Sequence, residues 1–185
     1  MRITGHAHEA VKNFIVPGDI VVDATVGNGY DALFLAQLVG PTGHVYGFDI
    51  QREAVDATTT LLGENKLSHF TLFRRDHAEM ADAVPAKHRG RIAAVAFNLG
   101  YLPGGNRDIT TTPGSTFAAL HAARGLLKHE GIVSVLAYRG HAVGPLEAEA
   151  VLEVMLGWSR AGDAVFVGPG DDPAVPQLIT AVKLR

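Results

Sequence analysis

The chain has 185 residues, of which 47% are apolar and 19% charged, so its composition fits a globular α/β domain and excludes a disordered chain. It contains no cysteine, which excludes disulfides, cysteine-based zinc sites and thiol nucleophiles. The net charge of −3 gives no argument for a polyanionic partner, although a local basic patch would be enough for a small RNA. We expect no signal peptide, no membrane span, no bound metal and a cytoplasmic location.

Apolar periodicity predicts helices alternating with strands along the whole chain. Helices are expected at residues 6–16, 30–39, 51–62, within 77–90, 112–129 and 145–158. Strands are expected at residues 20–24, 44–49, 70–73, 92–97, 132–138, 164–167 and 177–183. This order predicts a mostly parallel sheet with right-handed crossovers, closed by an antiparallel last strand. The pattern resembles the seven-stranded Rossmann-like fold of class I S-adenosylmethionine-dependent methyltransferases, in one domain spanning residues 1–185.

Three local signals refine this assignment. Thr112-Pro113 is a favourable helix start, with threonine as N-cap and proline at the first helical position, and Gly131 is expected to end that helix in a left-handed conformation. The less periodic segment 77–90 suggests one short helix broken at Pro85. His6 and His8 are two positions apart and would not share a helix face, so capping or surface roles are favoured over a metal pair.

A glycine turn, Gly27-Asn28-Gly29, follows the first strand and opens a helix. In this arrangement backbone N–H groups and the helix N-terminus approach a nucleotide-like ligand. Asp23 comes four residues before Gly27, where its carboxylate would repel the phosphates of a dinucleotide and attract the ammonium group of a methionine. The turn therefore favours S-adenosylmethionine over NAD, with a turn-forming role as the alternative for Asp23.

Two further strand ends carry candidate cofactor ligands. Asp49 ends the second strand twenty positions after Gly29, where a carboxylate can accept hydrogen bonds from both ribose hydroxyls. Asp76 and His77 follow the third strand, and either of them could contact the exocyclic amine of adenine. A purely structural role is equally compatible with either residue.

The segment Asn98-Leu99-Gly100-Tyr101 ends the fourth strand, at the edge where open α/β sheets keep their sites. The Asn98 side-chain oxygen and the Leu99 carbonyl can both accept hydrogen bonds from one –NH₂ group, which would aim its lone pair at an electrophile. Tyr101 can stack on a base or face a cation. The segment resembles the Asp/Asn-Pro-Pro-Tyr/Phe motif of amino-group methyltransferases, while a simple Asn-x-Gly turn is the alternative.

His141 follows the fifth strand and so reaches the same edge of the sheet. We expect it to act as a general base or a substrate contact, with a hydrogen-bonded loop histidine as the alternative. Glu147 lies on the next predicted helix, within expected reach of His141.

Taken together, these residues resemble the bacterial family once described as rRNA methylases, whose members are tRNA (5-aminomethyl-2-thiouridine) N-methyltransferases. The resemblance covers essentially the whole chain, and its most specific part is the stretch from Asn98 to Pro103. The matching segments are Asp23–Asp31, Phe34–Ala36, Gly47–Gln51, Phe97–Gly105, Thr111, Tyr138, Gly140, His141, Gly144 and Glu147.

The resemblance implies methyl transfer from S-adenosylmethionine to the aminomethyl group of the wobble (thio)uridine in a tRNA anticodon loop. It implies catalytic roles for Asn98, Leu99, Tyr101 and His141, with His141 or water accepting the proton. It also implies cofactor contacts from Asp23, Thr25, Gly27, Asn28, Gly29, Asp31, Asp49, Gln51, Asp76, His77 and Asn98. We further expect a homodimer, because a small domain with little basic surface needs two copies to hold a tRNA.

The chain departs from the family pattern at Asn106-Arg107, where Asp-Lys is common, and in the loop 168–176, which lacks the usual asparagine and double proline. These departures concern the RNA-contacting surface. A methyltransferase acting on another RNA or on a small-molecule amine therefore remains an alternative. An NAD-dependent oxidoreductase and a non-catalytic RNA-binding module are the alternatives from other functional classes.

Overall fold

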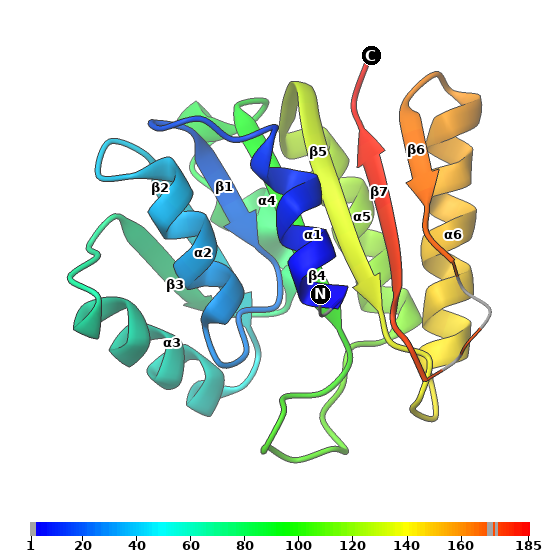
Figure 1. Ribbon diagram of the computed structural model, residues 1–185, viewed down its shortest axis with the longest axis horizontal. Coiled ribbons are helices and arrows are strands. Elements are labelled where there is room, and N and C mark those ends of the chain that lie inside the picture. The colour runs from blue at the N-terminus through cyan, green and yellow to red at the C-terminus, as the bar shows by residue number, and fades with distance from the viewer. Residues whose placement is uncertain (1–2, 170–171, 173) are drawn as a thin grey trace.

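One seven-stranded sheet, in the order β3-β2-β1-β4-β5-β7-β6, organises the fold (Figure 1). The computed structural model describes residues 3–169, 172 and 174–185. The strands are β1 (Ile20–Asp23), β2 (His44–Asp49), β3 (Phe70–Arg74), β4 (Ile92–Leu99), β5 (Leu127–Ala137), β6 (Ala164–Val167) and β7 (Gln177–Val182). The α-helices are α1 (Ile3–Lys12), α2 (Tyr30–Val39), α3 (Arg52–Glu64), α4 (Met80–Ala83), α5 (Pro113–Leu126) and α6 (Gly144–Arg160).

Helices cover both faces of the sheet, with α1, α2 and α3 on one side and α4, α5 and α6 on the other (Figure 1). Adjacent residues of β1 point to opposite faces, so Val21 packs with the α1 and α2 side chains and Val22 packs toward α5. Both valines are fully buried. This explains why β1 reads as a continuous apolar run rather than an alternating one.

The pairing confirms the predicted topology. Strands β1 to β5 run parallel, and β7 inserts antiparallel between β5 and β6. The chain returns to the middle of the sheet between β3 and β4, so strand order reverses between the neighbours β1 and β4. Crevices at such a switch point, outside the carboxyl ends of the strands, are where open α/β sheets bind ligands.

Two sequence expectations about the α5–β5 connection are wrong. Helix α5 ends at Leu126, and the residues expected to extend it to 129 belong to β5, where Leu127 pairs with Ile92. The left-handed residue is Glu130, with φ 60°, rather than Gly131. Gly131 is required for space, since an added Cβ would lie 2.9 Å from the Ile92 carbonyl oxygen.

Smaller differences concern the ends of elements and the irregular segments. The segment 77–90 forms two 3₁₀ turns, His77–Glu79 and Ala86–His88, flanking the short α4. Helix α1 lies a few residues earlier than expected. In the loop 168–176, Gly170, Asp171 and Pro173 lie outside the described residues. Within the described ranges, no helix combines the length and apolarity that a membrane crossing requires.

Candidate functional site

A cleft of about 790 Å³ opens at the carboxyl edge of the sheet, over the β1–β4 switch point. This volume lies within the range of about 300–1,000 Å³ that is usual for small-molecule sites. All four predicted catalytic residues line it, namely Asn98, Leu99, Tyr101 and His141. The predicted cofactor residues also line it, except Asp23 and Gly29. The tertiary structure thus brings the carboxyl ends of β1, β2 and β4, and the residues just before α3, together around one cleft.

The glycine turn is held in shape by the carboxylate of Asp49. Asp49 Oδ2 accepts a hydrogen bond from the Gly27 N–H at 3.1 Å, and its Oδ1 accepts one from the Gln51 N–H at 2.9 Å. Each carboxylate oxygen can accept a further bond, so Asp49 can still serve a ribose. Burial raises the pKa of the Asp49 carboxyl above its ordinary value. A ligand that donates hydrogen bonds to this carboxylate would therefore stabilise its charged form.

Gly29 does not line the cleft but lies where the turn packs against α3. Its φ of 86° lies in the left-handed region that favours glycine. A Cβ at this position would lie 3.0 Å from both Cα and Oγ1 of Thr58 on α3. Thr58 also donates a hydrogen bond to the Gly27 carbonyl at 3.1 Å. The close approach of α3 therefore requires glycine here, independently of any ligand.

Asp23 lies below the cleft wall and is 1% exposed. Its Oδ1 accepts a hydrogen bond from the Thr25 N–H at 3.1 Å, while its Oδ2 has no hydrogen-bond partner among the described residues. Burial, and then the negative charges of Asp31 and Asp49, raise the pKa of the Asp23 carboxyl well above its ordinary value. Asp23 is not among the residues that line the cleft, so its contact with a ligand ammonium group stays a prediction.

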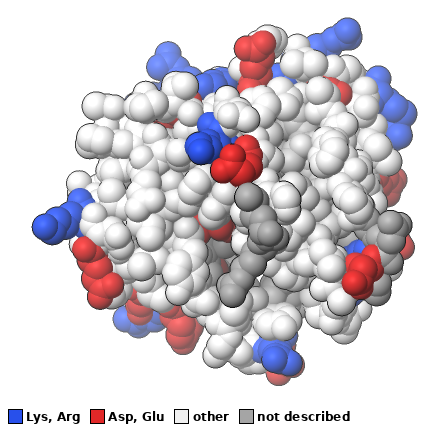
Figure 2. Space-filling model, viewed as in Figure 1, with Lys and Arg blue, Asp and Glu red and all other residues white. Residues whose placement is uncertain are grey.

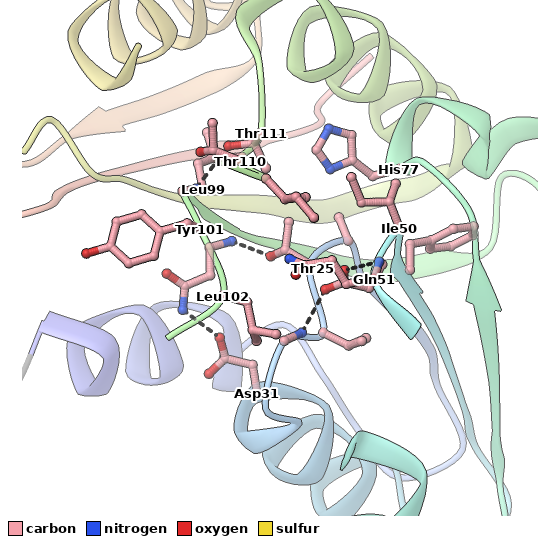
Figure 3. Close-up of a pocket in the computed structure, with 18 of the residues that line it drawn as sticks. Thr25, Asp31, Ile50, Gln51, His77, Leu99, Tyr101, Leu102, Thr110 and Thr111 are labelled. Carbon is pink, nitrogen blue, oxygen red and sulfur yellow. Dashed lines mark hydrogen bonds between the residues drawn. The ribbon is translucent and has the colours of Figure 1, made fainter. Parts of the chain in front are cut away.

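Asp76 and His77 form the opposite end of the cleft from Tyr101, and Figure 3 shows His77 and Tyr101 on opposite sides of the view. Asp76 caps the following 3₁₀ turn by accepting from the Ala78 N–H at 2.8 Å. His77 is 6% exposed, and its Nε2 has no hydrogen-bond partner in the described part of the chain. Burial lowers the pKa of His77, so its ring is neutral at neutral pH. Either residue keeps a polar atom for an adenine amine.

Asn98 is fixed at its backbone and at its side chain by different residues. Its N–H donates to Thr25 Oγ1 at 2.7 Å, which ties β4 to the end of β1. Its Nδ2 donates to Asp31 Oδ2 at 3.2 Å (Figure 3). A carboxylate only accepts hydrogen bonds, so the Asn98 nitrogen must face Asp31. The Asn98 Oδ1 is therefore the end of the amide that is left to accept a bond from a ligand.

The turn after Asn98 is held by a buried carboxylate on α6. The Gly100 N–H donates to Thr111 Oγ1 at 2.9 Å, and Thr111 Oγ1 donates to Glu147 Oε2 at 2.8 Å. Thr116 Oγ1 donates to the other oxygen, Glu147 Oε1, at 2.6 Å. Glu147 was expected to lie within reach of His141, but among the described residues it makes no hydrogen bond to this histidine, and both its carboxylate oxygens accept from threonine hydroxyls instead. Glu147 is 1% exposed and organises the turn from within the core.

Tyr101 and His141 lie together at the acceptor end of the cleft. Their rings meet edge to face, with centroids 6.2 Å apart. The Arg107 guanidinium lies 5.3 Å from the Tyr101 ring centroid, a cation–π contact. Tyr101 is 37% exposed, so it can receive a stacked ring, and no described residue offers a hydrogen-bond partner to the buried His141 Nε2.

His8 is one of the cleft residues that the sequence analysis missed. It was assigned to capping or the surface, whereas it lines the cleft with its Nε2 2.7 Å from Asp31 Oδ1. His6 is exposed, as expected. No local signal distinguishes the two histidines, because the position of His8 depends on how α1 packs against α2 and β5.

Charged side chains on the face shown in Figure 2 form small groups, several of mixed sign, mostly near its rim. Among the described residues drawn there, lysine and arginine do not gather into one broad patch (Figure 2). Arg75 and Arg107 stand closest to the chemistry, since Arg75 lines the cleft and Arg107 covers Tyr101.

Comparison with known proteins gives consistent matches. The family model described as "Putative rRNA methylase" matches residues 45–164. A curated relative, the chloroplastic tRNA (mnm5s2U34)-methyltransferase of Arabidopsis thaliana, is 41% identical over 159 residues, which cover 81% of this chain and 57% of that protein. The chain thus spans little more than half the length of this relative.

Two crystal structures match over nearly the whole chain. A protein from Clostridium thermocellum with the same rRNA-methylase description has a TM-score of 0.92 at 39% identity, covering 99% of this chain and 98% of its own. A Streptococcus mutans protein in complex with SAH has a TM-score of 0.86 at 28% identity, covering 100% and 99%.

Proposed function

Because the chain belongs to the rRNA methylase family, we propose that it transfers a methyl group from S-adenosylmethionine to a primary amine of RNA. The specific acceptor that we propose is the aminomethyl nitrogen of the wobble (thio)uridine in tRNA. The Arabidopsis relative, a tRNA (mnm5s2U34)-methyltransferase, supports this choice, as does the SAH bound by the Streptococcus mutans protein.

The observation that carries the proposal is the orientation of Asn98 at the junction of the glycine turn and β4. Asp31 holds the amide nitrogen, so Oδ1 is the acceptor presented to a ligand –NH₂ group. An alkylamine is cationic in water, and the Asp31 carboxylate beside Asn98 attracts such a group. The neutral exocyclic amine of a nucleobase would gain less from this carboxylate. The site therefore fits an aliphatic amine best.

The residues of the cleft also fit the methyl donor. We assign Asp49 and Gln51 to the ribose hydroxyls, and His77 Nε2, which has no hydrogen-bond partner among the described residues, to the adenine amine. S-adenosylmethionine supplies an already activated methyl group, so the protein mainly has to align the acceptor with it. The amine nitrogen attacks the methyl carbon, the carbon–sulfur bond breaks, and its electron pair stays on sulfur.

The chain's own residues then handle the acceptor and its proton. The cationic form of the acceptor first gives one proton to His141 or water, and Asn98 Oδ1 and the Leu99 carbonyl orient the neutral amine that results. After methyl transfer the nitrogen again carries a positive charge, and it releases its extra proton to water. The wobble base is single-stranded in the anticodon loop, so it can leave the stack and lie on the exposed Tyr101 ring. Arg107 and Arg75 provide the nearby positive charge for RNA phosphates.

The test is methyl transfer to tRNA that carries or lacks the 5-aminomethyl group. We expect activity only on the aminomethyl tRNA. Equal activity on both, or activity only on ribosomal RNA or a free amine, would overturn the proposed acceptor. Asn98→Ala should abolish turnover while S-adenosylhomocysteine affinity, measured by calorimetry, stays within about threefold, because Asn98 acts mainly on the acceptor.

The homodimer and the cytoplasmic location stay predictions. Light scattering with and without tRNA measures the first, and localisation of a tagged chain measures the second.

A further inference from the structure

One carboxylate joins the N-terminal helix to the acceptor side chain of the cleft. Asp31 Oδ1 contacts His8 Nε2 at 2.7 Å, and Asp31 Oδ2 accepts from Asn98 Nδ2 at 3.2 Å. We propose that His8 is a positioning residue, which fixes the Asn98 amide through Asp31 so that its oxygen faces the substrate amine. This inference rests on the proposed function, in which Asn98 orients that amine.

The His8 ring is itself held rigidly. It stacks on Phe34 of α2, with centroids 3.8 Å apart and planes 3° from parallel. Asp31 lies on the same helix, so α2 fixes both the plane of the imidazole and the group that its Nε2 meets. Since a carboxylate only accepts, Nε2 carries the proton in this contact. His8 and Asp31 are half-buried, at 28% and 21% exposed, so water competes for this contact only in part.

The contact matters because an asparagine amide has two nearly equivalent orientations. The Asn98 backbone is fixed separately by Thr25, which leaves the side-chain torsions, among them the terminal one that decides the orientation of the amide. That torsion is broad and roughly two-fold, so the backbone alone does not decide which end of the amide faces the cleft. Turned around, the amide would present –NH₂ to the substrate –NH₂, donor against donor.

A carboxylate tied at one oxygen removes this ambiguity. With His8 on Oδ1, the Asp31 carboxylate cannot rotate freely, and Oδ2 stays directed at Asn98. Without His8, Asp31 can turn toward water, and the productive orientation of Asn98 becomes one of several. The loss should therefore appear in the chemical step rather than in cofactor binding.

Two substitutions separate the hydrogen bond from the packing. His8→Phe keeps a flat ring against Phe34 and removes the donor, whereas His8→Gln loses the ring and keeps an N–H at the position of Nε2. With the full chain and aminomethyl tRNA, we expect His8→Phe to lower kcat about tenfold, the scale of one lost charge-assisted contact. S-adenosylhomocysteine affinity should stay within about twofold, and His8→Gln should recover kcat to within about threefold of the original chain.

A second measurement does not depend on activity. The side-chain amide protons of Asn98, followed by NMR, should exchange faster with solvent in His8→Phe but not in His8→Gln. Melting temperatures of both variants establish that they are folded.

The inference is overturned if folded His8→Phe keeps kcat within twofold, if it loses cofactor affinity by the same factor as kcat, or if His8→Gln is equally impaired. Unchanged Asn98 exchange in His8→Phe also overturns it. An original chain that fails to methylate aminomethyl tRNA overturns the proposed function instead, and the positioning role of His8 falls with it.

Discussion

Thr111→Val should lower both stability and turnover, because a single hydroxyl links the Asn98–Tyr101 segment to the buried Glu147. That hydroxyl accepts from the Gly100 N–H at 2.9 Å and donates to Glu147 Oε2 at 2.8 Å. Valine has nearly the same shape, so the change removes two hydrogen bonds with little loss of packing. Each buried polar group left without a partner costs about 1–3 kcal/mol.

The Gly100 N–H is only half-buried and can recover part of this cost from water. We therefore expect the free energy of unfolding to fall by about 2–4 kcal/mol. In a chain of this length, that corresponds to a melting temperature lower by roughly 4–16 °C. Urea denaturation and thermal melting measure the loss, and methyl transfer to aminomethyl tRNA measures turnover, which should fall about tenfold or more as the turn loosens.

Thr116→Val is the matched control. It removes only the 2.6 Å bond to Glu147 Oε1 and leaves the contact between Thr111 and Gly100 in place. It should cost about 1–3 kcal/mol of stability while turnover stays within about threefold. Thr111→Ser, which keeps a hydroxyl, should recover most of the turnover. If Thr111→Val and Thr116→Val reduce turnover equally, or if neither does, the Gly100 contact does not position the site.

Three further predictions concern the cofactor end. Asp49→Ala should weaken S-adenosylhomocysteine binding at least about tenfold, since it frees the Gly27 N–H and removes the ribose acceptor; unchanged calorimetric affinity would contradict this. Burial raises the pKa of Asp23, so the folded state keeps this carboxyl protonated to a higher pH than the unfolded state does. The free energy of unfolding should therefore fall as pH rises from the ordinary pKa to the raised one. Asp23→Asn should flatten this decline in pH-dependent denaturation, and an identical slope would refute the assignment. Gly29→Ala should cost about 1–2 kcal/mol from its left-handed φ alone, read from the melting temperature, and a neutral substitution would show that the turn can relax.

The sequence by itself determined the fold class, the order of the strands along the chain and most of the cleft wall. These features are carried by local patterns: continuous apolar runs for buried strands, helical periodicity between them, and polar residues directly after strand ends. Parallel strands bring such ends to one edge, so Asp49, His77, Asn98 and His141 could be expected together before the structure was known. The closeness of Asp49 to the glycine turn follows from the same rule, because β1 and β2 are neighbouring parallel strands.

Only the tertiary structure decided how those residues are held. His8 enters the cleft because α1 packs beside α2, and nothing in its neighbouring residues distinguishes it from the exposed His6. Glu147 turns to Thr111 and Thr116 because α5 and α6 pack together, a contact that helix spacing within α6 does not encode. Leu127 leaves the predicted helix because it pairs with Ile92. In each case a contact distant in sequence outweighs a local preference, since burial and hydrogen bonding in the folded chain contribute more free energy than local propensity.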